Sequence, residues 1–187
     1  MEIIILRHGK VNYPPIRIIS SSEFIDWVEA YNSNDLDMSV RPTRNALDTI
    51  QYANAVICSE LPRSQASALA LGAKDIHVKD ALFNEADLPI TEGKYIRLSV
   101  RLWAIIYRLM WFGGYSNNSE SLKDTRLRAQ KATNKLLETA EEHKKVVFVG
   151  HGIINHLIAK ELLTQGWQGP KSPGRKYWEY GVYKYKL

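Results

Sequence analysis

The apolar residues of this chain fall into two alternating patterns, short uninterrupted runs and longer segments with helical spacing. The runs at residues 2–6, 55–58 and 146–149 are rich in Ile and Val, which indicates strands buried on both faces. Residues 76–78 predict a further brief strand. Near the end of the chain, residues 177–185 alternate in character, which is typical of an edge strand covered on one side.

Helical patterns occupy the intervals between these strands. A serine run at residues 20–22 can cap the first helix, whose apolar face carries Phe24 and Trp27. Pro42 and Pro62 suit the first turns of two more helices. The predicted longer helices span residues 96–112, 119–143 and 153–163, and the predicted loops span 8–20, 32–40 and 84–93.

Strands that alternate with helices favour a parallel sheet between two helical layers. We therefore expect an α/β fold, a three-layer α/β/α sandwich with a mostly parallel central sheet and a C-terminal edge strand. No internal repeat, linker or low-complexity tract divides the chain, and its 187 residues suit a single core. One domain over residues 1–187 is predicted.

The composition is that of an ordinary globular protein, with 45% hydrophobic and 24% charged residues. The 25 basic and 20 acidic side chains leave a formal net charge of +5, spread along the chain. So small an excess suits a small anionic substrate and gives no reason to expect nucleic acid as a partner. Arg97, Arg101 and Arg108 form one basic cluster, which is either a solvated helix face or a contact for substrate or a polyanion.

The single cysteine, Cys58, excludes an internal disulfide and favours a reducing compartment; its apolar surroundings indicate a buried thiol. No apolar run approaches the ~20 residues that a membrane helix needs, so no membrane partner is expected. Met1 leads almost directly into the first strand, without the basic and apolar segments of a secretory signal. We expect a cytoplasmic protein, and the sequence leaves its oligomeric state open.

The candidate chemistry lies at the ends of three predicted strands. Arg7 and His8 follow the first apolar run, Ser59 and Arg63 follow the second, and His151 follows the third. Ligands of an open α/β sheet bind beyond the carboxyl ends of its strands, so the topology brings these residues to one rim. Arg63 also begins a helix, whose free amides favour anions. The sequence therefore predicts an anion site beside a histidine.

Phosphoryl transfer fits this set of side chains, because it requires positioning and charge neutralisation more than covalent chemistry from the protein. Arg7 and Arg63 supply planar, permanently charged donors for phosphate oxygens. A neutral His8 can attack phosphorus and form a phosphohistidine, and His151 can donate to the same oxygens. The surrounding cations would lower the pKa of His8 and keep its attacking nitrogen free.

The leaving oxygen needs a proton from the opposite side of the phosphorus atom. Glu85, in the loop after the third predicted strand, is the preferred donor, ahead of Asp87, Glu92 and Asp80. A carboxyl group beside a phosphate dianion is pushed toward its protonated form, as a general acid requires. The same carboxylate could then activate the water that hydrolyses the phosphohistidine.

These motifs resemble the histidine phosphatase superfamily, also called the phosphoglycerate-mutase-like family. The resemblance rests on the Arg7-His8-Gly9 triplet and covers roughly residues 2 to 165. It implies a covalent phosphohistidine at His8 and an acid at Glu85, with no metal or organic cofactor. The histidines show no zinc-site spacing either. The other matching segments are residues 59–66, 82–85 and 149–152, and the implied phosphate pocket comprises Arg7, His8, Arg63 and His151.

Two positions depart from the family pattern. Lys10 stands where many relatives have an acidic or small residue, and it either contacts substrate or is solvated. Ser119 replaces the glycine of a Gly-Glu-Ser segment, so Glu120 either lines the pocket or belongs to a helix start capped by serines. Trp103 or Trp111 could form a wall of the pocket, and packing in the core is the alternative for both.

The prediction is a phosphatase that hydrolyses a small phosphorylated metabolite through a covalent phosphohistidine intermediate on His8, with Glu85 as proton donor. Three alternatives stay open: a phosphomutase, a phosphohistidine-protein phosphatase and a non-catalytic module that binds a phospho-ligand. The chain lacks the long insertion that closes over mutase substrates. Relatives that act on phosphohistidine tend to lack an acid equivalent to Glu85.

Overall fold

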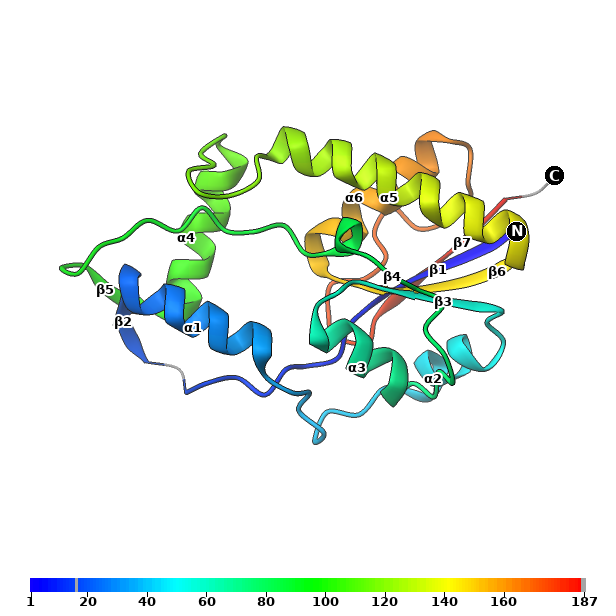
Figure 1. Ribbon diagram of the computed structural model, residues 1–187, viewed down its shortest axis with the longest axis horizontal. Helices are drawn as coiled ribbons and strands as arrows, with labels where there is room; N and C mark the ends of the chain where they lie inside the picture. Colours follow the sequence, from blue (N-terminus) through cyan, green and yellow to red (C-terminus); the bar gives the residue numbers. More distant parts are fainter. Residues whose placement is uncertain (16, 186–187) are drawn as a thin grey trace.

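The computed structural model describes residues 1–15 and 17–185, and its centre is a five-stranded sheet in the order β4-β3-β6-β1-β7 (Figure 1). Strands β4, β3, β6 and β1 pair in parallel, and β7 pairs antiparallel with β1 at the edge. The mixed sheet and its C-terminal edge strand are confirmed. The strands span Glu2–Arg7 (β1), Ala55–Cys58 (β3), Val78–Lys79 (β4), Lys145–Gly150 (β6) and Tyr180–Lys184 (β7).

Helices cover both faces of this sheet, which explains the uninterrupted apolar runs. In β1, Ile3 and Ile5 pack into the core under α5 and α6, whereas Ile4 and Leu6 pack under α2 and α3. Because successive side chains of a strand point to opposite faces, both sets must be apolar. The expected three-layer α/β/α sandwich is confirmed. These helices span Arg44–Gln51 (α2), Pro62–Ala70 (α3), Leu122–His143 (α5) and Gly152–Thr164 (α6).

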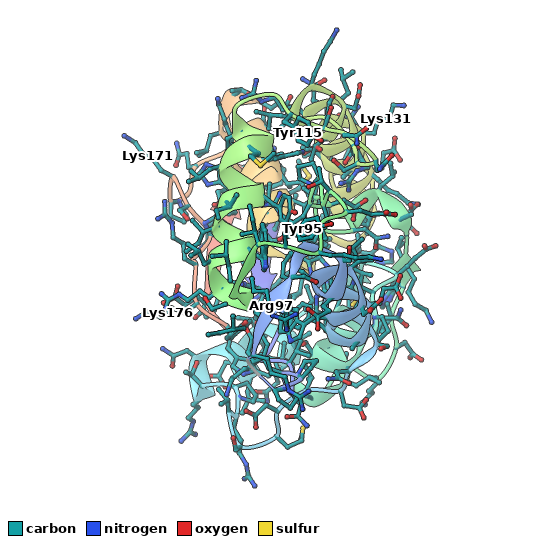
Figure 2. All side chains as sticks on the ribbon, turned by 90° about the vertical axis from the view of Figure 1, so that its left-hand side faces the viewer. Tyr95, Arg97, Tyr115, Lys131, Lys171 and Lys176 are labelled. Carbon is teal, nitrogen blue, oxygen red and sulfur yellow. The ribbon has the colours of Figure 1, made fainter. Side chains whose placement is uncertain are left out.

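A second group of elements, called the cap below, extends beyond the carboxyl ends of the parallel strands (Figure 1). It has its own apolar cluster, centred on Phe24, Val100, Trp103 and Tyr107. Figure 2 looks onto this end of the molecule, where Tyr95 is 99% exposed. The cap comprises α1 (Ser21–Ser33), α4 (Val100–Phe112) and a two-stranded sheet of β2 (Ile18–Ser20) and β5 (Arg97–Ser99).

The cap corrects two predictions from the sequence. The helix predicted from residue 96 begins at Val100, because Ser99 caps it by accepting from the backbone of Leu102, and residues 97–99 form a strand. That strand pairs with residues 18–20, the end of the segment predicted as a loop. Strands of three residues carry too short a pattern to read as strands.

The remaining boundaries shift by only a few residues. The helix placed at Pro42 begins at Arg44 with Thr43 as its cap, and the helix placed at residue 119 begins at Leu122, capped by Ser121. A short 3-10 helix, η1 (Ala81–Phe83), precedes the Glu85 loop. Within residues 1–15 and 17–185, no helix is both long and apolar enough to cross a membrane.

Candidate active site

The ends of β1, β3 and β6 bring together the side chains that the sequence predicts for the anion site. Arg7 ends β1 and His8 follows it, Arg63 lies in the first turn of α3, and His151 caps α6 directly after β6. The imidazole centroids of His8 and His151 are 5.0 Å apart. His8, Arg63 and His151 are almost wholly buried. One polar cluster therefore forms from residues 144 positions apart.

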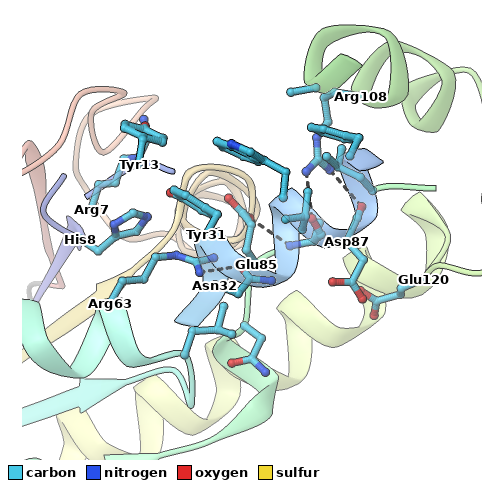
Figure 3. Close-up of a pocket in the computed structure, with 18 of the residues that line it drawn as sticks. Arg7, His8, Tyr13, Tyr31, Asn32, Arg63, Glu85, Asp87, Arg108 and Glu120 are labelled. Atoms are coloured by element: carbon cyan, nitrogen blue, oxygen red, sulfur yellow. Dashed lines mark hydrogen bonds between the residues drawn. The ribbon is translucent and has the colours of Figure 1, made fainter. Parts of the chain in front are cut away.

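A cavity of about 650 Å³ opens beside this cluster and runs toward the cap (Figure 3). Figure 3 shows Arg7, His8 and Arg63 at one side and Arg108 at the other, with Glu85 between them. We call these sides the histidine end and the distal end. The other lining residues used below are Tyr13, Phe24, Trp27, Val28, Tyr31, Asn32, Asn84, Asp87, Glu120, Arg128 and Tyr177.

His8 is held as the tautomer that a nucleophile needs. Its Nδ1 lies 2.7 Å from the backbone oxygen of Gly9, an acceptor only, so Nδ1 carries the proton. The other ring nitrogen, Nε2, then keeps its lone pair. Burial is the main reason that the pKa of His8 falls to about 3, and the charges of Arg63 and Arg7 lower it further. The ring is therefore neutral at physiological pH.

The two arginines at the histidine end keep donors free for an anion. Arg63 donates from Nη1 to Asn32 Oδ1 at 2.8 Å and from Nε to His151 Nδ1 at 3.3 Å. Arg7 donates from Nη1 to the backbone oxygen of Arg175, and its buried Nε has no partner. Among the described residues, neither guanidinium forms an ion pair with a carboxylate. Their positive charge is available to a ligand.

Both ring nitrogens of His151 are engaged. Nδ1 accepts from Arg63, so Nε2 carries the proton and donates to Ser59 Oγ at 2.7 Å. Complete burial keeps the pKa of His151 well below its ordinary value, and the neighbouring His8, Arg63 and Arg7 lower it further. His151 is thus a neutral ring, and its donation to a phosphate, expected from the sequence, requires it to exchange Ser59 for a phosphate oxygen.

Glu85 lies at the N-terminal end of α6. Its Oε1 accepts from the backbone amides of Ile153 and Ile154 at 3.1 Å each, and from Ala86 at 3.0 Å. Oε2 shares only the Ile153 amide, at 3.1 Å. A side chain at Gly152 would begin 3.5 Å from Oε2 and 3.9 Å from Arg7 Cζ. Glu85 and Arg7 therefore flank the same open position at the helix N-terminus.

A buried hydrogen-bond network that sequence reasoning missed holds the three strand ends in register. Asn155 accepts from the His151 amide and donates to the Leu6 carbonyl, both at 3.0 Å. Ser64 Oγ accepts from the Ser59 amide and donates to the carbonyl of Val149. Asn155 and Ser64 are buried, and each both donates and accepts a hydrogen bond. The sequence could signal them only as polar residues on the inner face of a helix.

Gly9 and Trp178 lock the loop beyond His8. Any Cβ at residue 9 would overlap the indole of Trp178, so only glycine fits there. Trp178 has φ of +66°, which is uncommon for a tryptophan, and it donates from Nε1 to the Val40 carbonyl at 2.9 Å. Its backbone amide also bonds to the Arg7 carbonyl at 3.1 Å. The segment before β7 is thereby pinned against the end of β1.

Tyr177 is a further residue near His8 that the sequence did not reveal. Its ring centre lies 4.7 Å from Arg7 Cζ and 5.6 Å from the His8 ring, and its hydroxyl contacts the hydroxyl of Tyr13. Burial raises the pKa of Tyr13, and the contact with Tyr177 adds to that effect. Two loops far apart in the chain thus meet over the histidine end through a tyrosine pair.

The two substrate-binding candidates have different surroundings. Lys10 is not among the cavity-lining residues; it pairs with Asp37 at 2.8 Å. Glu120 does line the cavity, but its carboxylate is bound by Arg128 at 2.8 Å and by Thr125 at 2.9 Å. Trp103 and Trp111 pack in the core, and the tryptophan that lines the cavity is Trp27.

The single cysteine lies in the buried strand β3. Cys58 is buried as expected, and burial raises the pKa of its thiol to about 12. In the part of the chain that the structure describes, no three His, Cys, Asp or Glu side chains are grouped in a way that could hold a metal ion.

Comparison with known proteins identifies the family of this chain. A family model described as histidine phosphatase superfamily (branch 1) matches residues 37–184, most of the chain. The chain belongs to the histidine phosphatase superfamily. The matched residues include Arg63, Glu85 and His151, and they begin after Arg7 and His8. No curated protein matches the chain.

Solved structures support the fold of this superfamily member. A mycobacterial glucosyl-3-phosphoglycerate phosphatase is 20% identical, with a TM-score of 0.56 over 87% of this chain and 79% of its own. The alpha-ribazole phosphatase of Shigella flexneri is 17% identical, with a TM-score of 0.52 over 87% and 79%. An open reading frame product of Mycobacterium tuberculosis is 18% identical, with a TM-score of 0.59 over 99% and 91%. At these sequence identities, the similarity shows a shared fold only.

Proposed function

We propose that this protein is a phosphatase that hydrolyses a small phosphorylated metabolite through a covalent phosphohistidine on His8, without a metal ion. The observation that carries the proposal is the state of His8. Its Nδ1 proton is tied to the Gly9 carbonyl and its pKa is about 3, so Nε2 is a permanently available nucleophile. Membership of the superfamily supports the same chemistry.

The first half of the reaction transfers the phosphoryl group to the enzyme. His8 Nε2 attacks phosphorus as the bond from phosphorus to the leaving alcohol oxygen breaks. Arg7 and Arg63 neutralise the equatorial oxygens, because neither is paired with a carboxylate in the described residues. Glu85 gives a proton from Oε2 to the departing oxygen and becomes a carboxylate.

The second half returns the enzyme to its starting state. The Glu85 carboxylate takes a proton from a water molecule, whose oxygen attacks the phosphoryl group as the nitrogen–phosphorus bond breaks. Inorganic phosphate leaves, and His8 regains its lone pair. His151 would donate to the phosphate from Nε2 when it releases Ser59, as its neutral tautomer allows.

Hydrolysis of p-nitrophenyl phosphate and of an alkyl phosphate in the presence of a chelator tests this proposal. We expect His8→Ala to abolish both activities and Glu85→Gln to slow the alkyl ester by about 10²–10⁴-fold, because alkoxide leaves poorly without a proton. The nitrophenyl ester should be less affected. The matched controls are His156→Ala and Glu92→Gln, two exposed residues outside the cavity.

A trapping experiment separates the covalent mechanism from its rivals. Enzyme quenched in base during turnover should carry a phosphoryl group that acid removes, and the His8→Ala protein should carry none. Wild-type hydrolysis that persists in His8→Ala would overturn the covalent step. Transfer of the phosphate to another hydroxyl of the same molecule, without release of inorganic phosphate, would establish a mutase.

A further inference from the structure

The cavity is far larger than a phosphate group requires. Its volume of about 650 Å³ lies in the range of pockets that enclose a complete small molecule. The proposed phosphate position occupies only the histidine end. The remaining space, toward the cap, must receive the alcohol portion of the substrate, and its lining residues therefore describe that portion.

One wall of this space is aromatic. Phe24, Trp27, Val28 and Tyr31 recur at helical spacing along α1 and all line the cavity. The rings of Trp27 and Tyr31 are inclined by 8° with centroids 5.6 Å apart, and Tyr13 is inclined by 15° to Trp27. Near-parallel rings offer a platform against which a flat ligand ring can lie.

Two polar groups at this wall and beyond it lack partners in the structure. The buried Nε1 of Trp27 has no hydrogen-bond acceptor. Within residues 1–15 and 17–185, the carboxylate of Asp87 has neither a hydrogen bond nor an ion pair. Partial burial raises the pKa of Asp87; the charges of Arg128 and Arg108 lower it, and those of Glu120 and Glu85 raise it. Asp87 is solvent-exposed at the distal end of the cavity, where its carboxylate can accept from a ligand.

The cations of the distal end are already engaged. Arg128 binds Glu120 and the carbonyls of Leu82 and Asn84, and Arg108 donates to the carbonyls of Ala86 and Asp87. A second anionic group on a ligand would meet the carboxylates of Asp87 and Glu120 here, beside Arg108, whose hydrogen bonds go to backbone carbonyls. A hydroxyl or ammonium group would find Asp87.

We propose that the substrate is the phosphate monoester of a ring compound, whose ring lies against Trp27 and whose hydroxyl or amino groups donate to Asp87. This inference rests on the proposed function for the position of the phosphate. Sugar phosphates and nucleoside monophosphates share the required chemistry. Linear alkyl phosphates lack the ring, and bisphosphates place a negative charge beside Asp87 and Glu120.

Calorimetric binding to the His8→Ala protein tests the inference without any need for turnover. The ligands are glucose phosphate, glucosamine phosphate, adenosine monophosphate, glycerol phosphate and fructose bisphosphate. At least one ring monophosphate should bind about tenfold more tightly than glycerol phosphate or the bisphosphate. A preference for the sugar phosphates or for the nucleotide identifies which class of ring compound the cavity binds.

Two variants in the same background assign the preference to residues. Trp27→Leu should remove the difference in affinity between the ring ligands and glycerol phosphate. Asp87→Asn should weaken glucosamine phosphate by about tenfold or more, because an ammonium–carboxylate pair is lost, and glucose phosphate by less. The matched controls are Tyr95→Leu and Asp26→Asn, which are exposed and outside the cavity.

The outcomes separate this inference from the proposed function. Binding that prefers ring ligands, and that loses this preference in Trp27→Leu, would support the inference. It would do so even if the wild-type protein hydrolysed none of these esters; in that case only the proposed function fails. Two results would overturn the inference: equal affinity for ring and linear phosphates, or a preference for ring ligands that both variants retain. Neither result would contradict the proposed hydrolysis through a covalent phosphohistidine.

Discussion

The two ends of the cavity each hold two arginines, and only the distal end holds one that pairs with a carboxylate among the described residues. At the histidine end, Arg7 and Arg63 have neutral protein partners and no carboxylate among the described residues. At the distal end, Arg128 binds Glu120 at 2.8 Å, and Arg108 is bonded to two carbonyls and stacked 4.9 Å from Trp111. We therefore expect the arginines of the histidine end to bind an anion, whereas Arg128 holds Glu120 and two backbone carbonyls in place.

We infer that an arginine without a carboxylate partner is better placed to bind an anion than one that is already paired. A guanidinium whose donors face a carboxylate has already exchanged water for a permanent partner, and a ligand must displace that partner to bind. Arg7 keeps a buried Nε without any acceptor, a cost that a phosphate oxygen could relieve.

The largest effect should come from removing an arginine of the histidine end. Arg63→Ala is expected to lower kcat/KM for p-nitrophenyl phosphate by about 10²–10³-fold, since one donor to the transition-state oxygens is lost. Arg108→Ala should cost about tenfold or less, because its guanidinium serves the backbone. Arg126→Ala, exposed on α5, is the control. Equal losses for Arg63 and Arg108 would contradict the distinction between the two ends.

The stability of the two ends should differ as well. Asn155→Ala leaves the His151 amide and the Leu6 carbonyl buried without partners, so we expect a loss of about 1–3 kcal/mol in the free energy of unfolding. Glu120→Gln, in the more accessible ion pair of the distal end, should cost about 1 kcal/mol or less. Urea denaturation measures both, with exposed Asn134→Ala as control. A larger loss for Glu120 would reverse the comparison.

The sequence could predict the histidine end because its residues follow strands. Carboxyl ends of parallel strands meet at one edge, so His8 and His151 were brought together by topology alone. The distal end depends on how the cap pairs residues 18–20 with 97–99, a contact between three-residue strands. Trp27 was therefore recognised as an apolar helix position and not as a cavity wall. Site residues and the single-domain organisation remain predictions.

Contacts that depend on backbone conformation could not be predicted from the sequence either. Tyr177 reaches Arg7 because Trp178 adopts a positive φ and fills the space above Gly9. No spacing pattern signals a left-handed tryptophan, since the conformation is imposed by tertiary packing. The Arg-His-Gly triplet does not indicate which residue packs against the glycine.

A pH dependence of stability should also distinguish the histidine end. His8 has a pKa of about 3 in the folded protein against 6.5 when unfolded, so between these values the unfolded chain binds more protons. The contribution is complete above pH 6.5 and is lost progressively as the pH falls toward 3, by about 2 kcal/mol at pH 5. We expect His8→Gln to lose correspondingly less stability between pH 7 and pH 5 than the wild type. Identical losses would contradict a neutral, buried His8.

The smallest effect concerns the tyrosine pair that closes the histidine end. Tyr13→Phe and Tyr177→Phe each remove one hydroxyl of the contact but keep the Tyr177 ring beside Arg7. We expect a rise in KM of about 2- to 10-fold for either variant, since one hydrogen bond that orders two loops is lost. The double variant should be no worse than either single one, because both remove the same interaction. Additive losses would show that the hydroxyls act separately, with Tyr177 then contacting the substrate in its own right. Tyr95→Phe, fully exposed on the cap, provides the baseline.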